Sequence, residues 1–161
     1  MAEITIRPAT PEDTGQILAF VRGLAEYENA LHEVVASEAD IATALFGDKS
    51  RGVEALICLQ GTAPVGFALY FFSFSTWTGR HSLFLEDLYV APEHRGSGAG
   101  KALLKALAKE AVARNCARFE WNVLDWNEPA IRFYESLGAR PQREWIGYRL
   151  SGDALQALAS D

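Results

Sequence analysis

Residues that commonly bind metals or form cross-links are scarce in this sequence. It contains two cysteines, Cys58 and Cys116, which lie far apart and form no C-x-x-C pair. Its three histidines, His32, His81 and His94, lack the spacing of metal ligands. We therefore expect free thiols, as in a cytoplasmic protein, and neither a metal site nor a redox pair.

Long apolar runs and an excess of basic charge are also lacking. No run approaches the roughly 18 apolar residues of a membrane span, and the first residues lack the basic flank and apolar core of a signal peptide. Fifteen basic residues against 21 acidic ones give a net charge of −6. This balance argues against nucleic acid as the main partner and is compatible with a cationic substrate. We expect a cytoplasmic protein with no membrane or nucleic-acid partner.

The organisation of the chain predicts one domain over residues 1–161. Its length and its 49% content of apolar residues suit a single core, and no repeat or linker-like stretch interrupts it. Strand patterns occupy residues 3–7, 53–60, 65–74, 82–90, 117–123 and 145–150. Helix patterns start at Thr10-Pro11, cover 37–47, 97–114 and 127–137, and recur briefly at the end of the sequence.

The order of these elements predicts the fold class. Consecutive strands in the middle favour antiparallel pairing, whereas the later strand-helix-strand unit needs a parallel crossover. We therefore predict an α/β (α+β) fold with a mixed, mostly antiparallel central sheet and helices on both faces.

A glycine-rich turn, RGSGAGK at residues 95–101, lies between the strand ending at Val90 and a long helix. Closely spaced glycines let an anion approach the main chain, and the free amides at a helix start bind phosphate. The spacing does not fit a Walker A loop, a G-x-G-x-x-G dinucleotide fingerprint or a G-x-S-x-G nucleophile elbow. The turn is thus predicted to hold a phosphate or pyrophosphate, and the alternative is a strand-to-helix connection without a ligand.

This turn resembles the R/Q-x-x-G-x-G/A coenzyme A loop of the GNAT acetyltransferases. Within that superfamily, five segments resemble the diamine (spermidine/spermine) and thialysine acetyltransferases: IRPAT at 6–10, LAEYE at 24–28, VGFALY at 65–70, LEDLYV at 85–90 and VLDWNEP at 123–129. The similarity runs from residue 4 to about residue 150. It implies the GNAT acyl-CoA N-acyltransferase fold, acetyl-CoA as cosubstrate and a homodimer.

The resemblance also implies roles for individual residues. Tyr134 matches the general acid, and Glu86 matches a carboxylate that helps to deprotonate the amine through water. Leu88 to Val90 match the strand that pairs with the pantetheine arm. The implied cofactor-binding residues are Leu88, Tyr89, Val90, Arg95, Gly96, Ser97, Gly98, Ala99, Gly100, Lys101, Asn127, Glu128, Pro129 and Ala130. The implied substrate-facing residues are Tyr27, Glu28, Glu86, Glu120, Trp121 and Asn122.

The chemistry of acetyl transfer fits these residue types. An alkylamine with a pKa of about 10.4 is almost fully protonated at pH 7. Carboxylates attract the cation and a base then removes a proton, while a tyrosine stays protonated and can give one to the leaving thiolate. Glu86 and Asp87 are adjacent in a predicted strand, so alternation points them to opposite sides. We expect only one of them in the amine pocket, and the resemblance favours Glu86.

The predicted function is an N-acetyltransferase that moves acetyl from acetyl-CoA to a primary amine of a small molecule, by direct attack in a ternary complex. Neither cysteine falls on a motif position, so an acetyl-cysteine intermediate is not expected. Ser75 stands where the polyamine enzymes carry an acid, so a lysine-like or thialysine-like amino acid or a short diamine is as plausible as spermidine. Acetylation of a protein or peptide, and a non-catalytic acyl-CoA-binding domain, are the alternatives.

Overall fold

A five-stranded mixed sheet forms the centre of the computed structural model, which describes residues 2–48 and 50–160. The strands lie in chain order, and each neighbouring pair is antiparallel except β4 and β5, which are parallel. Their bounds are β1 (Ile4–Pro8), β2 (Glu54–Gln60), β3 (Ala63–Ser75), β4 (Arg80–Val90) and β5 (Arg118–Trp121). The predicted sheet type and the parallel crossover through the long helix are confirmed.

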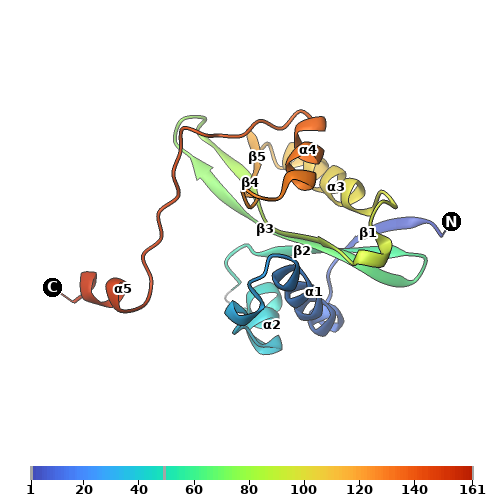
Figure 1. Cartoon of the computed structure of the whole chain (residues 1–161), viewed down its shortest axis with the longest axis horizontal. Coiled ribbons are helices and arrows are strands. Elements are labelled where there is room, and N and C mark those ends of the chain that lie inside the picture. Colours follow the sequence, from blue (N-terminus) through green and yellow to red (C-terminus); the bar gives the residue numbers. More distant parts are fainter. Residues whose placement is uncertain (1, 49, 161) are drawn as a thin grey trace. The chain divides into compact units, whose positions relative to one another are not determined.

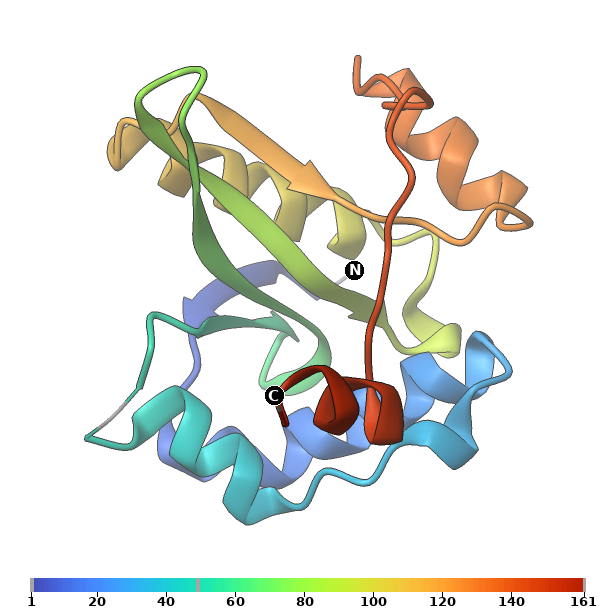
Figure 2. The same ribbon diagram turned by 90° about the vertical axis from the view of Figure 1, so that its left-hand side faces the viewer.

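Helices cover both faces of this sheet. Helices α1 (Thr14–Tyr27) and α2 (Glu38–Phe46) lie on one face and α3 (Ala99–Ala113) on the other (Figures 1 and 2). Beneath α1, Ile17 and Phe20 pack on Ile57 and Phe67, all nearly inaccessible to water. The α3 face is sealed by the leucines of that helix, Leu103, Leu104 and Leu107. Apolar residues at helical spacing thus form both layers, as predicted.

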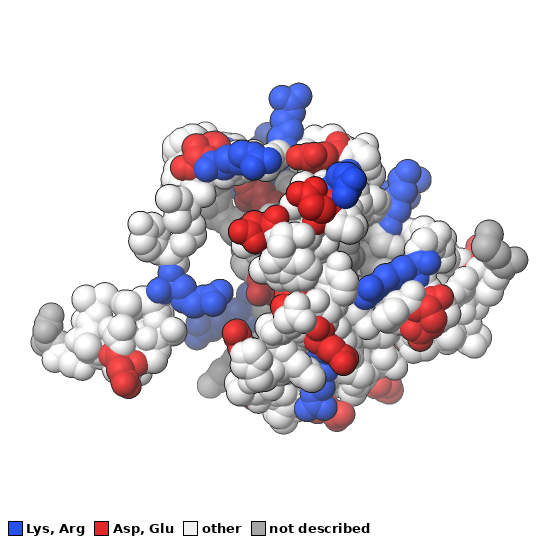
Figure 3. Space-filling model, in the orientation of Figure 1, with Lys and Arg blue, Asp and Glu red and all other residues white. Residues whose placement is uncertain are grey.

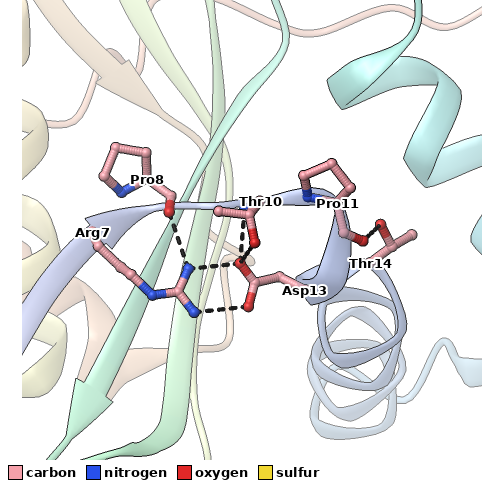
Figure 4. Close-up of polar contacts among 6 residues, drawn as sticks. All are labelled: Arg7, Pro8, Thr10, Pro11, Asp13 and Thr14. Carbon is pink, nitrogen blue, oxygen red and sulfur yellow. Dashed lines mark hydrogen bonds and ion pairs between the residues drawn. The ribbon is translucent and has the colours of Figure 1, made fainter.

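The chain enters α1 through a charged cap (Figure 4). Thr10 precedes a single 3-10 turn, η1 (Pro11–Asp13), and its main-chain N–H donates to Asp13 Oδ2 at 2.7 Å. Arg7 on β1 donates two hydrogen bonds to the same carboxylate, at 2.7 and 2.9 Å. This guanidinium holds the pKa of Asp13 at about 2. The predicted helix start at Thr10-Pro11 is confirmed, and the ion pair ties it to the first strand.

A second polar network anchors the far end of α3 to the sheet. Arg114 donates to both carboxylate oxygens of Glu54 on β2, each at 2.8 Å, and its guanidinium lies 4.6 Å from the ring centre of Phe72. The Tyr70 hydroxyl donates to Glu54 Oε2 at 2.9 Å. Tyr70 and Phe72 of β3 therefore belong to the α3 face of the sheet, whereas Phe67 belongs to the α1 face.

The chain divides into two compact units, the first ending at Asn122 and the second beginning at Val123. The second unit contains α4 (Glu128–Ser136) and α5 (Gly152–Leu158), joined by an extended segment. The predicted strand at 145–150 is wrong, because these residues are assigned to no strand. An alternating pattern favours extended backbone, but a strand also needs a partner to complete its hydrogen bonds. The prediction of one domain over 1–161 stays a prediction.

Candidate active site

An irregularity in β4 shapes the candidate site. On one side of it Leu85 pairs with Tyr70, and on the other Asp87 pairs with Leu69, so Glu86 is an extra residue in the strand. Such a bulge interrupts the alternation of side chains. Leu85 shares the α3 face with Tyr70, whereas Asp87 shares the α1 face with Leu69. We expected the side chains of Glu86 and Asp87 to point to opposite sides of a regular strand, but the strand is irregular at Glu86.

Three carboxylates share one electrostatic environment around this bulge. Burial, together with the smaller effect of the charges of Glu86 and Glu28, raises the pKa of Asp87 to about 6. Burial also raises the pKa of Glu28, which stands at the end of α1. We call Glu28, Glu86 and Asp87 the acidic cluster. Sequence reasoning selected Glu28 and Glu86 but missed Asp87, because a bulge has no signature in the LEDLYV pattern.

The end of α1 is fixed by a Schellman motif, which positions Tyr27 and Glu28. Asn29 takes a positive φ of 59°, and its N–H donates to Glu26 O at 3.1 Å. The next N–H, of Ala30, reaches back to Ala25 O at 2.8 Å. Asparagine tolerates this left-handed conformation better than most residues other than glycine. The helix therefore stops cleanly where the acidic cluster begins.

Strands β4 and β5 separate next to the bulge. Their pairing runs from Ser82 with Arg118 to Leu85 with Trp121, and β4 continues to Val90. In the part of the first unit that the structure describes, the edge of β4 beyond Leu85 has no strand beside it on that side. The predicted pantetheine-binding residues, 88–90, lie on this unpaired stretch. An extended ligand pairs with such an edge as an added strand does.

The predicted substrate residues on β5 are placed on different sides. Trp121 pairs with Leu85 and therefore shares the α3 face, whereas its neighbour Glu120 pairs with Phe84 on the α1 face. Glu120 Oε1 lies 4.0 Å from Arg118 Nη1. Asn122 follows the end of the strand. Of this group, Glu120 shares the face of the acidic cluster, and Trp121 does not.

The glycine-rich turn prepares the start of α3. Gly96 and Gly98 have φ of 76° and 92°, which favour glycine, and a Cβ at either position would meet no atom within 4 Å. Ser97 Oγ donates to His94 O at 2.6 Å, which steadies the turn. The first helical bond runs from Ala102 N to Gly98 O at 2.9 Å. The amides before it, at the positive end of the helix dipole, lack a carbonyl of the helix to bond and are suited to an anion.

Arg95, the first residue of the turn, lies against two aromatic rings. Its Nε donates to Val90 O at 3.0 Å. Its guanidinium carbon is 4.8 Å from the ring centre of Tyr27 and 5.7 Å from that of Tyr89. These contacts join the glycine-rich turn to the end of α1. Sequence reasoning assigned the three residues to two separate groups and gave no signal that they meet.

Comparisons with known proteins show which family the chain resembles. Residues 24–139 match the sequence model of the acetyltransferase (GNAT) family. Over 99% of both chains, the sequence is 40% identical to a thialysine N-epsilon-acetyltransferase of Sus scrofa. It is 30% identical to an L-ornithine N5-acetyltransferase of Arabidopsis thaliana, over 95% of this chain and 86% of that protein. An integron cassette protein from the mobile metagenome of V. cholerae has a TM-score of 0.82 and 30% identity, over 100% and 99% of the two chains.

The chain belongs to the GNAT acetyltransferase family. The predicted fold and the predicted class, an N-acetyltransferase enzyme, are thereby confirmed. The family match extends across the boundary between the two units at 122–123.

The remaining predicted site residues of this acetyltransferase lie in the second unit. Asn127 caps α4, and its side chain accepts a hydrogen bond from Ala130 N at 3.4 Å. Glu128 and Pro129 form the first turn of that helix, and Tyr134 lies further along it, 5.7 Å from Phe133 between ring centres. The predicted helix at 127–137 is confirmed. The cofactor contacts of its first turn and the role of Tyr134 as general acid stay predictions.

On the face in Figure 3, acidic and basic side chains are interspersed. Within residues 2–48 and 50–160, no group of three or more His, Cys, Asp or Glu is placed to hold a metal ion. No helix among the described residues has the length and apolar character needed to cross a membrane.

Proposed function

We propose that this GNAT enzyme transfers an acetyl group from acetyl-CoA to a primary amine of a small molecule. The observation that carries the proposal is the acidic cluster beside the unpaired edge of β4, on the same strand that leads into the glycine-rich turn. β4 thus carries two of the carboxylates for a cation, and the chain that follows it supplies the amides for a diphosphate. The domain as a whole, 1–161, is proposed to act as one catalytic unit.

The residues present fit coenzyme A. Gly96 and Gly98 leave open the space that a Cβ would occupy, so a pyrophosphate can approach the main chain of the turn closely. Lys101, exposed on the first turn of α3, adds a positive charge. We assign the remaining cofactor contacts to the edge at 88–90 and to the start of α4 at 127–130. When bound, acetyl-CoA supplies an activated acetyl thioester.

The chain's own residues are proposed to manage two protons. Glu86, exposed at the bulge, takes a proton from the substrate ammonium through water, which frees the nitrogen lone pair for attack on the acetyl carbonyl. As the C–N bond forms and the C–S bond breaks, the Tyr134 hydroxyl gives a proton to the sulfur, and the second proton that the attacking nitrogen loses returns through water to the Tyr134 oxygen, which leaves a neutral amide and a free thiol. Main-chain N–H groups near Leu88 stabilise the charge on the carbonyl oxygen.

Direct attack is favoured over an acetyl-cysteine intermediate. Cys58 is buried in the sheet, and burial raises the pKa of its thiol, which disfavours the nucleophilic thiolate. Cys116 lies between the end of α3 and β5, outside the motif positions. We therefore propose that amine and cofactor are bound together when the acetyl group moves.

The acceptor is proposed to be a lysine-like or ornithine-like amino acid or a short diamine, with polyamines as further candidates. The relatives named for thialysine and L-ornithine support the first group. Ser75 is engaged in its turn, where its hydroxyl accepts a hydrogen bond from Thr78 N at 3.3 Å. A neutral residue at this point offers no charge for the distal amine of a long polyamine.

A thiol-release assay with acetyl-CoA tests this function. The acceptor panel contains thialysine, lysine, ornithine, putrescine, spermidine and a lysine-containing peptide. We expect turnover on at least one of the small amines, and Tyr134→Phe should lower kcat strongly while coenzyme A affinity stays nearly unchanged. Coenzyme A binding without turnover on any acceptor would contradict the enzymatic proposal, and turnover on the peptide alone would redirect it to proteins. We expect a homodimer by light scattering.

A further inference from the structure

We propose that Arg95 is a positioning residue that couples the cofactor turn to the amine-facing end of α1. This inference rests on the proposed function, because it assigns the two ends of one contact to the two substrates of that reaction. It gives Arg95 a contact with the end of α1 that a role in phosphate binding alone does not require.

The geometry of Arg95 directs its guanidinium away from a purely phosphate-binding role. The Nε–H donates to Val90 O at 3.0 Å, which fixes the side chain along the end of β4. The guanidinium then lies 4.8 Å from the centre of the Tyr27 ring and 5.7 Å from that of Tyr89. Both distances fall within the roughly 6 Å over which a cation is attracted by an aromatic ring.

The two aromatic partners come from different elements. Tyr89 stands on β4, with its ring 5.7 Å from that of Phe20 in the core beneath α1. Tyr27 is the last residue of α1 and precedes Glu28 of the acidic cluster. Tyr89 is therefore a fixed support, and Tyr27 belongs to the segment that we assign to the amine. Arg95 holds the two together and begins the turn that we assign to the diphosphate.

A contact of this kind makes the two binding events interdependent. The contact between Arg95 and the Tyr27 ring holds the glycine-rich turn in its binding geometry. Without Tyr27 the turn must be ordered when coenzyme A binds, and this cost lowers the affinity for the cofactor. Because the same contact also holds the end of α1, removing Arg95 loosens that end and weakens amine binding. A cation–π contact at an exposed position changes an equilibrium by roughly two- to fivefold.

A double-mutant cycle on coenzyme A affinity tests the coupling. Calorimetric titrations with coenzyme A compare the wild-type chain with Tyr27→Leu, Arg95→Ala and the double variant, and Tyr27→Phe is the matched control that keeps the ring. We expect Tyr27→Leu to weaken coenzyme A binding roughly two- to fivefold, Tyr27→Phe to weaken it less than Tyr27→Leu because the ring is kept, and Tyr27→Leu to have no further effect once Arg95 is alanine. Where an acceptor is turned over, Arg95→Ala should raise its KM while kcat changes less.

Other outcomes separate the inference from the function on which it rests. The coupling would be overturned if the fold-changes in coenzyme A affinity of the two single variants multiplied in the double variant, or if Tyr27→Leu left the affinity unchanged. Either result would leave the acetyltransferase proposal standing. A wild-type chain that binds no coenzyme A would refute the proposed cofactor. In that case the same four chains are compared by their thermal midpoints without ligand. A double variant whose thermal midpoint is no lower than that of the less stable single variant supports the Arg95–Tyr27 contact. Shifts in the midpoint that add in the double variant overturn it.

Discussion

Replacing Asp87 with asparagine should stabilise the folded chain at neutral pH. The half-buried position of Asp87 and the charges of Glu86 and Glu28 raise the pKa of its carboxyl from 3.8 to about 6. The folded state therefore binds this proton more tightly than the unfolded state does. Its stability falls as the pH rises from about 4 to about 6, and the cost of the ionised carboxylate is fully present above that range.

The magnitude follows from the two pKa values. Each pH unit between them corresponds to about 1.4 kcal/mol, so the ionised carboxylate costs at most roughly 3 kcal/mol at pH 8. An amide of the same size carries no charge to bury. Asp87→Asn should raise the free energy of unfolding by up to this amount at pH 8, or the thermal midpoint by several degrees. Near pH 4, where both states hold the proton, the gain should vanish.

Urea unfolding at pH 4 and pH 8 measures the difference. Glu26→Gln is a suitable control, because it removes an exposed carboxylate from the last turns of α1 without touching the bulge. The control should change the free energy of unfolding little at either pH. An Asp87→Asn variant that is destabilised at both pH values, or stabilised equally at both, would refute the placement of this carboxylate in a buried, acidic environment.

Three further substitutions, the last with a matched control, test two ion pairs of the fold and the glycine-rich turn. Asp13→Asn should lower the free energy of unfolding at pH 7 by about 1–2 kcal/mol, and urea unfolding should show the difference fading as the pH falls from about 4 to 2, where the ionised carboxylate of Asp13 loses its advantage. Arg114→Met leaves Glu54 without its ionic partner and should raise the pKa of Glu54. Thermal unfolding of this variant should show that the free energy of unfolding falls by about 1 kcal/mol. Gly98→Ala should cost about 1 kcal/mol and weaken coenzyme A binding, because the φ of 92° disfavours a side chain. In contrast, Gly100→Ala meets only Val90 Cγ2 at 3.9 Å and should be tolerated in the same melts.

Local chemistry explains which elements were predictable. Thr10 and Pro11 mark the approach to α1 by capping and a fixed φ, and Ser37 caps α2 by accepting a hydrogen bond from Asp40 N at 3.2 Å. Gly138, with φ of 90°, follows the end of α4. Each of these signals lies within a few residues of the structure that it specifies. A sequence pattern can therefore be interpreted there without knowledge of the tertiary structure.

The failures have the opposite character, because they depend on distant partners. The segment 145–150 has a strand-like pattern but no strand assignment, since pairing is a property of two segments rather than one. The bulge at Glu86 is likewise set by the register of β4 against β3. Asp87 was consequently missed, although its neighbour Glu86 was selected from the same six-residue segment.

One extra residue in β4 accounts for much of the candidate site. If β4 alternated regularly from Leu85 onward, residues 87 and 89 would follow it onto the α3 face. The bulge instead places both beneath α1, and Gly23 is the residue of that helix that leaves room, since a Cβ there would come within 2.5 Å of the Tyr89 hydroxyl. The register shift therefore positions both the half-buried carboxylate of Asp87 and the Tyr89 ring against which Arg95 lies. The acidic cluster and the link to the cofactor turn thus have one structural cause.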